Sequence, residues 1–117
     1  MEESIYCIIS EEEWAEAKTR GAFEPESLES EGFIHCSYPR QLIRVANKHF
    51  FNRKKLIIAC IHRSKLPCKV VDEDLYQLND LYPHIYGPLL IEAVYDVVPF
   101  SCKADGTFDL PDKLQPS

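Results

Sequence analysis

The eight residues 55–62, with the sequence KLIIACIH, decide the fold class because they contain the longest apolar run of the chain. The six apolar residues from Leu56 to Ile61 do not alternate with polar ones, which predicts a strand buried on both faces. Six residues are far fewer than the roughly 20 that a membrane-spanning helix needs. The sequence therefore predicts a central strand in a packed sheet and no segment that spans a membrane.

A strand and a helix are expected at the N-terminal end of the chain. Residues 4–9 are largely apolar, which predicts a short buried strand. Ser10 and Glu13 have the spacing of a capping box, so a helix is expected to begin after Ser10 and to end at Gly21. Residues 22–31 contain a proline and few apolar side chains, which predicts a surface connection with room for one short turn of helix.

A second helix is expected over residues 38–51, directly before the central strand. Ser37 is its expected N-cap, and Pro39 is tolerated in its first turn. Basic residues recur on one face of this helix at a spacing of four, as Arg40, Arg44 and Lys48. This basic face begins beside His35, and the helix N-terminus adds backbone N–H groups there, a combination suited to binding an anion.

Further strands are expected at residues 68–71, 89–98 and 107–110, and residues 82–88 are expected to be a turn because they are rich in proline and glycine. Strands and helices do not alternate regularly. We therefore expect an α+β fold with small antiparallel sheets flanked by two main helices. A chain of 117 residues accommodates one domain, expected at residues 1–111, followed by a flexible C-terminal tail at 112–117.

The composition indicates the cellular compartment and excludes some kinds of binding site. The five cysteines form no C-x-x-C pair and fit no disulfide framework, so we expect reduced thiols. The N-terminus carries acidic residues where a targeting peptide would carry basic ones, and a cytoplasmic protein is expected. Four glycines cannot supply a glycine-rich phosphate loop, and the histidine spacing fits no metal motif. No metal and no required cofactor are expected.

The charge is distributed unevenly. The net charge is -6, yet residues 32–71 contain nine basic residues and no acidic one. Either these bases pair with the acidic flanking segments in the fold, or they line a site for an anion such as a phosphate. The acidic net charge disfavours nucleic acid as a partner.

Two short segments combine polar groups with apolar ones: residues 32–37, GFIHCS, and residues 83–89, PHIYGPL. On a strand, Phe33, His35 and Ser37 share one face, so the imidazole and the hydroxyl project together. Each histidine could equally be a structural hydrogen-bonding residue. If both segments meet beside the basic helix, they form a site for a phosphate and a sugar.

These two segments also carry a resemblance to a known family. Shorter matches accompany them: Ile5-Tyr6, Trp14, Gln41, Ala46-Asn47, Phe50-Phe51, Ala93-Val94 and Gly106-Thr107-Phe108. From about Ile5 to Leu110, the chain is similar to the domain of unknown function 952 family. That family is grouped by fold with the ADP-ribosyltransferase-like superfamily, which binds NAD between two small antiparallel sheets.

The resemblance implies a site for NAD or an ADP-ribose-type nucleotide, with NAD as substrate or ligand rather than as a required cofactor. His35 would hold the ribose, and His84 or Tyr86 would lie near the nicotinamide. Glu92 is the candidate for a third position that is usually a catalytic glutamate. With the residues singled out by the sequence pattern, the expected catalytic residues are His35, His84 and Tyr86, and the expected ligand-binding residues are Ser37, Arg40, Arg44, Asn47 and Glu92.

The resemblance leaves the activity open between a glycosyltransferase and a hydrolase that act on such nucleotides. The alternative is a non-catalytic domain that recognises a protein or peptide in the same cleft. A small anionic nucleotide-type ligand is the expected partner, and a protein partner is the second expectation.

Overall fold

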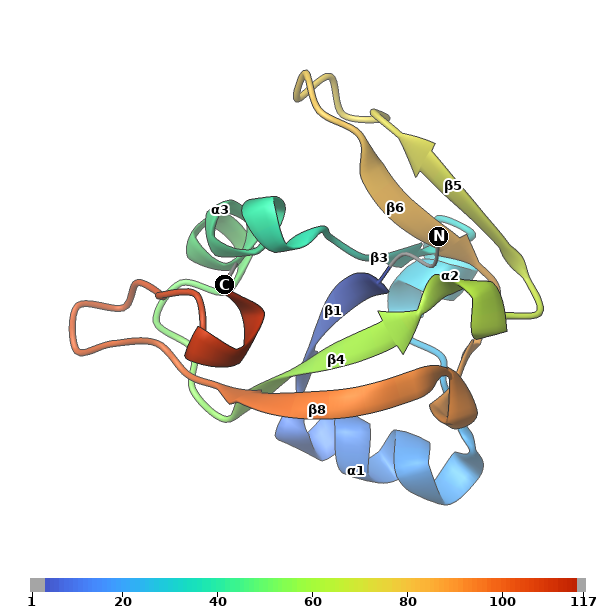
Figure 1. Cartoon of the computed structure of the whole chain (residues 1–117), viewed down its shortest axis with the longest axis horizontal. Coiled ribbons are helices and arrows are strands. Elements are labelled where there is room, and N and C mark those ends of the chain that lie inside the picture. The colour runs from blue at the N-terminus through green and yellow to red at the C-terminus, as the bar shows by residue number, and fades with distance from the viewer. Residues whose placement is uncertain (1–3, 116–117) are drawn as a thin grey trace.

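The computed structural model describes residues 4–115 and has an α+β fold with three small antiparallel sheets (Figure 1). The first sheet contains β1 (Ser4–Ser10), β4 (Leu56–His62) and β8 (Val94–Phe100) in the order β1-β4-β8. The strand predicted from the apolar run is therefore central, with an antiparallel neighbour on each side.

Apolar side chains cover both faces of this sheet, as the unbroken run in β4 predicts. Alternate β4 residues enter two different cores: Ile57, Ala59 and Ile61 point into one, and Leu56, Ile58 and Cys60 into the other. Helix α1 (Glu11–Arg20) packs Trp14 and Ala17 into the first core, and α3 (Pro39–His49) packs Leu42 and Ala46 into the second. The two main helices thus lie on opposite sides of the central sheet (Figure 1).

The second sheet carries both histidine motifs. It contains β3 (Ile34–His35), β6 (Tyr82–Tyr86) and β5 (Lys69–Glu73) in the order β3-β6-β5. The β5–β6 hairpin extends away from the central sheet (Figure 1). A third sheet pairs β2 (Ala22–Phe23) with β7 (Leu89–Leu90), and the short helix α2 (Glu26–Ser30) leads into β3.

The helix boundaries follow local chemistry. Ser10 caps α1 by accepting a hydrogen bond from the N–H of Glu13 at 3.0 Å, and Gly21 ends the helix at φ +88°, as predicted. The N-cap of α3 is Tyr38 rather than Ser37, because the Gln41 side chain accepts from the Tyr38 N–H at 2.9 Å.

Three expectations for the second half of the chain were wrong. Residues 82–86 form β6 instead of a turn, and Pro83 takes part through its carbonyl, which accepts from the N–H of Cys36 at 3.1 Å. The segment 89–98 is divided between β7 and β8 by the 3₁₀ helix η2 (Ile91–Ala93). Residues 107–110 form no strand, and the backbone N–H of Phe108 instead donates to Asn47 Oδ1 at 2.8 Å.

Two short 3₁₀ helices complete the chain: η1 (Arg63–Lys65) after β4, and η3 (Asp112–Leu114) near the C-terminus. The expected tail thus begins with η3, in which Leu114 packs against the second core and Lys113 pairs with Asp96 at 2.9 Å. The last part of the expected tail, residues 116–117, lies outside the described residues.

Candidate functional site

A cavity of about 790 Å³ lies between α3, β1 and the paired strands β3 and β6. His35, Ser37 and His84 all line it, so the two motifs that the sequence singled out meet at one place. Ligand sites in proteins commonly have about this size and combine an apolar lining with a few polar groups. We refer to this space as the histidine cavity.

The two histidines are direct cross-strand partners. His35 lies opposite His84 in the β3–β6 register, so both side chains leave the same face of the sheet. Their ring centroids are 5.4 Å apart, with planes inclined by 79°. Phe33 stacks on the His84 ring at 4.2 Å and meets the His35 ring edge-on at 4.9 Å. The aromatic contact fixes His84, which is only 2% exposed.

A glutamate on the neighbouring strand holds the buried histidine. Oε1 of Glu73 lies 2.9 Å from Nδ1 of His84 and also accepts a hydrogen bond from the Tyr86 hydroxyl. These two contacts, with Tyr86 the stronger, lower the pKa of Glu73 below its ordinary value. The same contact raises the pKa of Tyr86, so a carboxylate and a neutral phenol face each other.

A second glutamate holds the exposed histidine in the same manner. Oε2 of Glu31 lies 3.1 Å from Nε2 of His35, and the Tyr76 hydroxyl donates to the other oxygen of Glu31. The Tyr76 ring also stacks over His35, with centroids 5.9 Å apart. Tyr76 and then His35 lower the pKa of Glu31. Burial, followed by the contact with Glu31, raises the pKa of Tyr76 to about 12.

Basic side chains from α3 form the opposite wall of the cavity. Arg44, Lys48 and His49 line it. Arg44 donates to Asp80 at 2.9 Å and to the Tyr82 hydroxyl at 2.6 Å, whereas Lys48 forms no ion pair with any residue in the range 4–115. Burial and the nearby charges of Lys48 and His35 lower the pKa of His49, which favours its neutral form. The positive charge of this wall therefore comes from Arg44 and Lys48.

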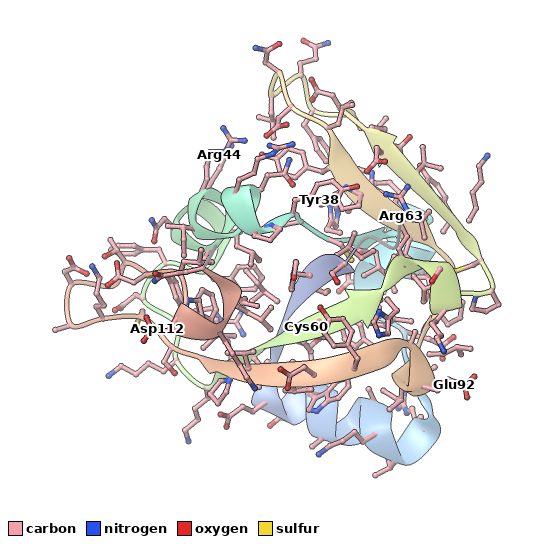
Figure 2. All side chains as sticks on the ribbon, in the orientation of Figure 1. Tyr38, Arg44, Cys60, Arg63, Glu92 and Asp112 are labelled. Atoms are coloured by element: carbon pink, nitrogen blue, oxygen red, sulfur yellow. The ribbon has the colours of Figure 1, made fainter. Side chains whose placement is uncertain are left out.

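The remaining predicted residues lie outside the lining. Nη1 of Arg40 instead donates to both carboxylate oxygens of Asp80, at 2.8 and 3.0 Å. Asn47 holds the backbone of Phe108, and Glu92 lies on η2, across the molecule from Arg44 (Figure 2). Tyr86 reaches the cavity only through its hydrogen bond to Glu73. Both arginines thus pair with an acidic segment, as the first interpretation of the charge pattern predicts.

The residues of the site that were not predicted from the sequence include Glu31, Glu73 and Tyr76. Glu31 stands four residues before His35, close enough to have been considered part of the first motif. Glu73 and Tyr76 could be placed only by pairing β5 with β6, and the proline in β6 concealed that strand. The carboxylates of the site therefore come from positions that the motifs do not include.

Two structural features are absent from the described part of the chain. Among residues 4–115, no three His, Cys, Asp or Glu side chains are grouped so that they could hold a metal ion. Within the same range, no helix has the length and apolar character needed to cross a membrane.

Comparison with known proteins identifies relatives over nearly the whole chain. The family model described as "Protein of unknown function (DUF952)" matches residues 8–97. The crystal structure of protein CC0527 from Caulobacter crescentus is 32% identical, with a TM-score of 0.86 over 96% of this chain and 98% of that chain. Its solution NMR structure is 32% identical, with a TM-score of 0.78 over 95% and 96% of the two chains. No curated protein matches.

Proposed function

The chain belongs to the DUF952 family of proteins of unknown function, and we propose that it binds an NAD- or ADP-ribose-type nucleotide in the histidine cavity. The observation that carries this proposal is the pair His35 and His84, held by two glutamates opposite a basic wall. Such a site offers one region for an anion and another for hydroxyl groups.

The two regions match the two chemical parts of a nucleotide. Lys48 supplies positive charge that no carboxylate of the described residues pairs with, and Arg44 lies beside it in a pair with Asp80; the charge of Lys48 attracts a phosphate group and increases its rate of association. Histidine nitrogens and carboxylate oxygens on the facing strands accept hydrogen bonds from sugar hydroxyls. The exposed ring of Tyr76 adds an aromatic surface beside His35, on which a base can stack.

The resemblance to ADP-ribosyltransferase-like proteins extends the proposal to a transfer or hydrolysis at the ribose of the bound nucleotide. Such chemistry develops positive charge on the sugar, and an ionised carboxylate nearby stabilises that charge. Glu31 and Glu73 line the cavity, whereas Glu92 does not, so we assign this role to the first two. The lowered pKa values of Glu31 and Glu73 favour their ionised forms.

An NMR titration of ¹⁵N-labelled protein with NAD, ADP-ribose and ADP tests this proposal. We expect saturable shifts at His35, Lys48 and His84 at millimolar ligand or below. His35→Ala and Lys48→Ala should each weaken binding by about tenfold, the size expected for one lost charged hydrogen bond. Lys18→Ala, an exposed residue on α1, is the control and should bind like the wild type. Absence of shifts near His35 and Lys48 with all three nucleotides would refute the proposal.

A peptide is the second candidate ligand, and a specific surface favours it. The loop between β5 and β6 exposes Leu75, Tyr76, Leu78 and Leu81, and Leu78 also lines the cavity. A displayed peptide library can be selected against the wild type and counter-selected against Leu75→Ser/Leu78→Ser. Peptides that bind only the wild type would support this function, and their absence would leave the nucleotide as the ligand class.

A further inference from the structure

The hydrogen bonds of the two histidines define their tautomers. An ionised carboxylate can only accept hydrogen bonds, so the imidazole nitrogen that faces it must carry the proton. Glu73 faces Nδ1 of His84 at 2.9 Å. Because the Tyr86 hydroxyl also donates to the same oxygen, Glu73 has no proton to offer the ring. Neutral His84 is therefore the Nδ1–H tautomer.

His35 shows the opposite arrangement. Glu31 faces its Nε2 at 3.1 Å, and Tyr76 donates to the second oxygen of that carboxylate. Neutral His35 is consequently the Nε2–H tautomer. Two histidines that are direct cross-strand partners thus leave different ring nitrogens without a proton, Nε2 in His84 and Nδ1 in His35.

The free nitrogen of His84 belongs to a residue that lines the histidine cavity. Among residues 4–115, no group forms a hydrogen bond with Nε2 of His84. This unpaired atom is not among the fully buried ones, so it keeps some exposed surface. His84 lines the cavity, although only 2% of the residue is exposed. Because Nε2 has no partner among the described residues and His84 lines the cavity, this nitrogen is available to a ligand that donates a hydrogen bond.

We propose that Glu73 is a positioning residue that fixes His84 as the Nδ1–H tautomer, so that Nε2 accepts a hydrogen bond from a hydroxyl group of the ligand. Only the identity of that ligand rests on the proposed function. Phe33 supports the arrangement by stacking on the ring, and Tyr86 supports it by holding the carboxylate. His84 is thus the acceptor of the cavity, and exposed His35 is a separate contact that Glu31 controls.

Ring ¹⁵N NMR of histidine-labelled, ligand-free protein at about pH 8 tests the positioning role by itself, because the two tautomers give distinct nitrogen shifts. In the wild type we expect the Nδ1–H form of His84 to exceed the other by about tenfold or more, since the hydrogen bond is charge-assisted. In Glu73→Ala the two forms should become comparable. Glu73→Gln should retain the Nδ1–H form, because its amide oxygen can still accept.

Glu31→Ala is the matched control, since it removes the same group from the other pair. It should leave the tautomer of His84 as in the wild type, because its effect is confined to His35. An Nε2–H form of His84 in the wild type, or an unchanged ratio in Glu73→Ala, would overturn the inference. A backbone NMR spectrum that matches the wild type confirms that each variant is folded.

Titration with ADP-ribose then connects the tautomer to the ligand. The Nε2 resonance of His84 should move on binding, and Glu73→Ala should weaken binding by about fivefold to tenfold, whereas Glu73→Gln stays within about twofold. Equal binding by Glu73→Ala and the wild type would overturn the role of Nε2. If neither the wild type nor the two Glu73 variants bind ADP-ribose, the proposed nucleotide function fails. The tautomer ratio of the ligand-free protein then decides the positioning role of Glu73 alone.

Discussion

His35 and His84 face each other across one antiparallel strand pair, yet their environments differ sharply. The His84 side chain is 2% exposed, and that of His35 is 45% exposed. Phe33 stacks closely on one ring face of His84 at 4.2 Å, whereas the ring that stacks on His35 belongs to the exposed Tyr76 and is 5.9 Å away. One histidine is part of the packed interior, and the other is available at its surface.

This difference predicts unequal effects of alanine substitution on stability. His84→Ala should lower the free energy of unfolding by about 2–4 kcal/mol, because it removes a packed ring and the hydrogen bond to Glu73. His35→Ala should lower it by less than about 1 kcal/mol, the usual range for an exposed site. Urea unfolding of both variants measures this. An equal loss in the two would contradict the separate roles assigned to them.

Gln41 should be necessary for the fold even though it is polar. It is completely buried, and its side chain accepts from the Tyr38 N–H at 2.9 Å and donates to the Leu81 carbonyl at 2.7 Å. Gln41→Ala removes both hydrogen bonds and the packed side chain, and it should cost about 2–4 kcal/mol in urea unfolding. Gln115→Ala, at an exposed position, is the control and should change stability by less than about 0.5 kcal/mol.

The central sheet was predictable because its evidence is local. The residues from Leu56 to Ile61 are all apolar, so a strand made of them has two apolar faces. Both faces must be covered by other side chains, and in the structure both are. Both main helices were predictable for a similar reason, since a capping serine and a proline in the first turn mark their starts. These features depend on residues close together in the sequence.

The site was predictable only in part because it depends on strand pairing. His35, Ser37 and His84 were singled out by their unusual local sequence, and the structure brings them to one cavity. Glu73 becomes a neighbour of His84 only when β5 pairs with β6, a strand that its proline concealed. The partner of Arg40 and Arg44, Asp80, is likewise distant in sequence, so charge pattern alone could not decide whether these bases were free.

Asp80 should stabilise the fold in a pH-dependent way. Contacts with Gln41 and then Arg40 lower its pKa from the ordinary 3.8 to about 2. A carboxyl group whose pKa is lowered by folding stabilises the protein above the unfolded-state value, and this contribution disappears as the pH falls through the folded-state value. Asp80→Asn should therefore be less stable than the wild type at about pH 6, and the difference should close between about pH 4 and pH 2.

Urea unfolding of both proteins across this pH range measures the effect. Asp109→Asn is the control, since that carboxylate is 75% exposed and pairs only with Lys103 among the described residues. A stability difference between Asp80→Asn and the wild type that stays constant down to about pH 2 would show that the carboxylate charge is not its cause.

Ile58 should be among the most sensitive core positions. It is fully buried in the central strand and points into the second core. Ile58→Ala should cost about 2–5 kcal/mol and Ile58→Val about 0.5–1.5 kcal/mol, because the cost increases with the cavity that each substitution leaves. Leu75→Ala, at a position 50% exposed, should cost less than about 0.5 kcal/mol. Similar losses for Ile58→Ala and Leu75→Ala would contradict the central placement of β4.

The cysteines should react with an alkylating agent in an order set by burial. Burial and then Asp96 raise the pKa of Cys60 to about 11, and burial raises that of Cys36 well above its ordinary value, so both remain thiols near neutral pH. Half-buried Cys102 should therefore be labelled before Cys36 and Cys60 by iodoacetamide at about pH 8, as followed by mass spectrometry of digested samples. In urea, Cys36, Cys60 and Cys102 should react at similar rates.

In Ile58→Ala, native labelling of Cys60 should become faster, because more frequent unfolding exposes it. Labelling of Cys36 ahead of Cys102 in the native wild type would contradict the burial of Cys36 beside the histidine cavity.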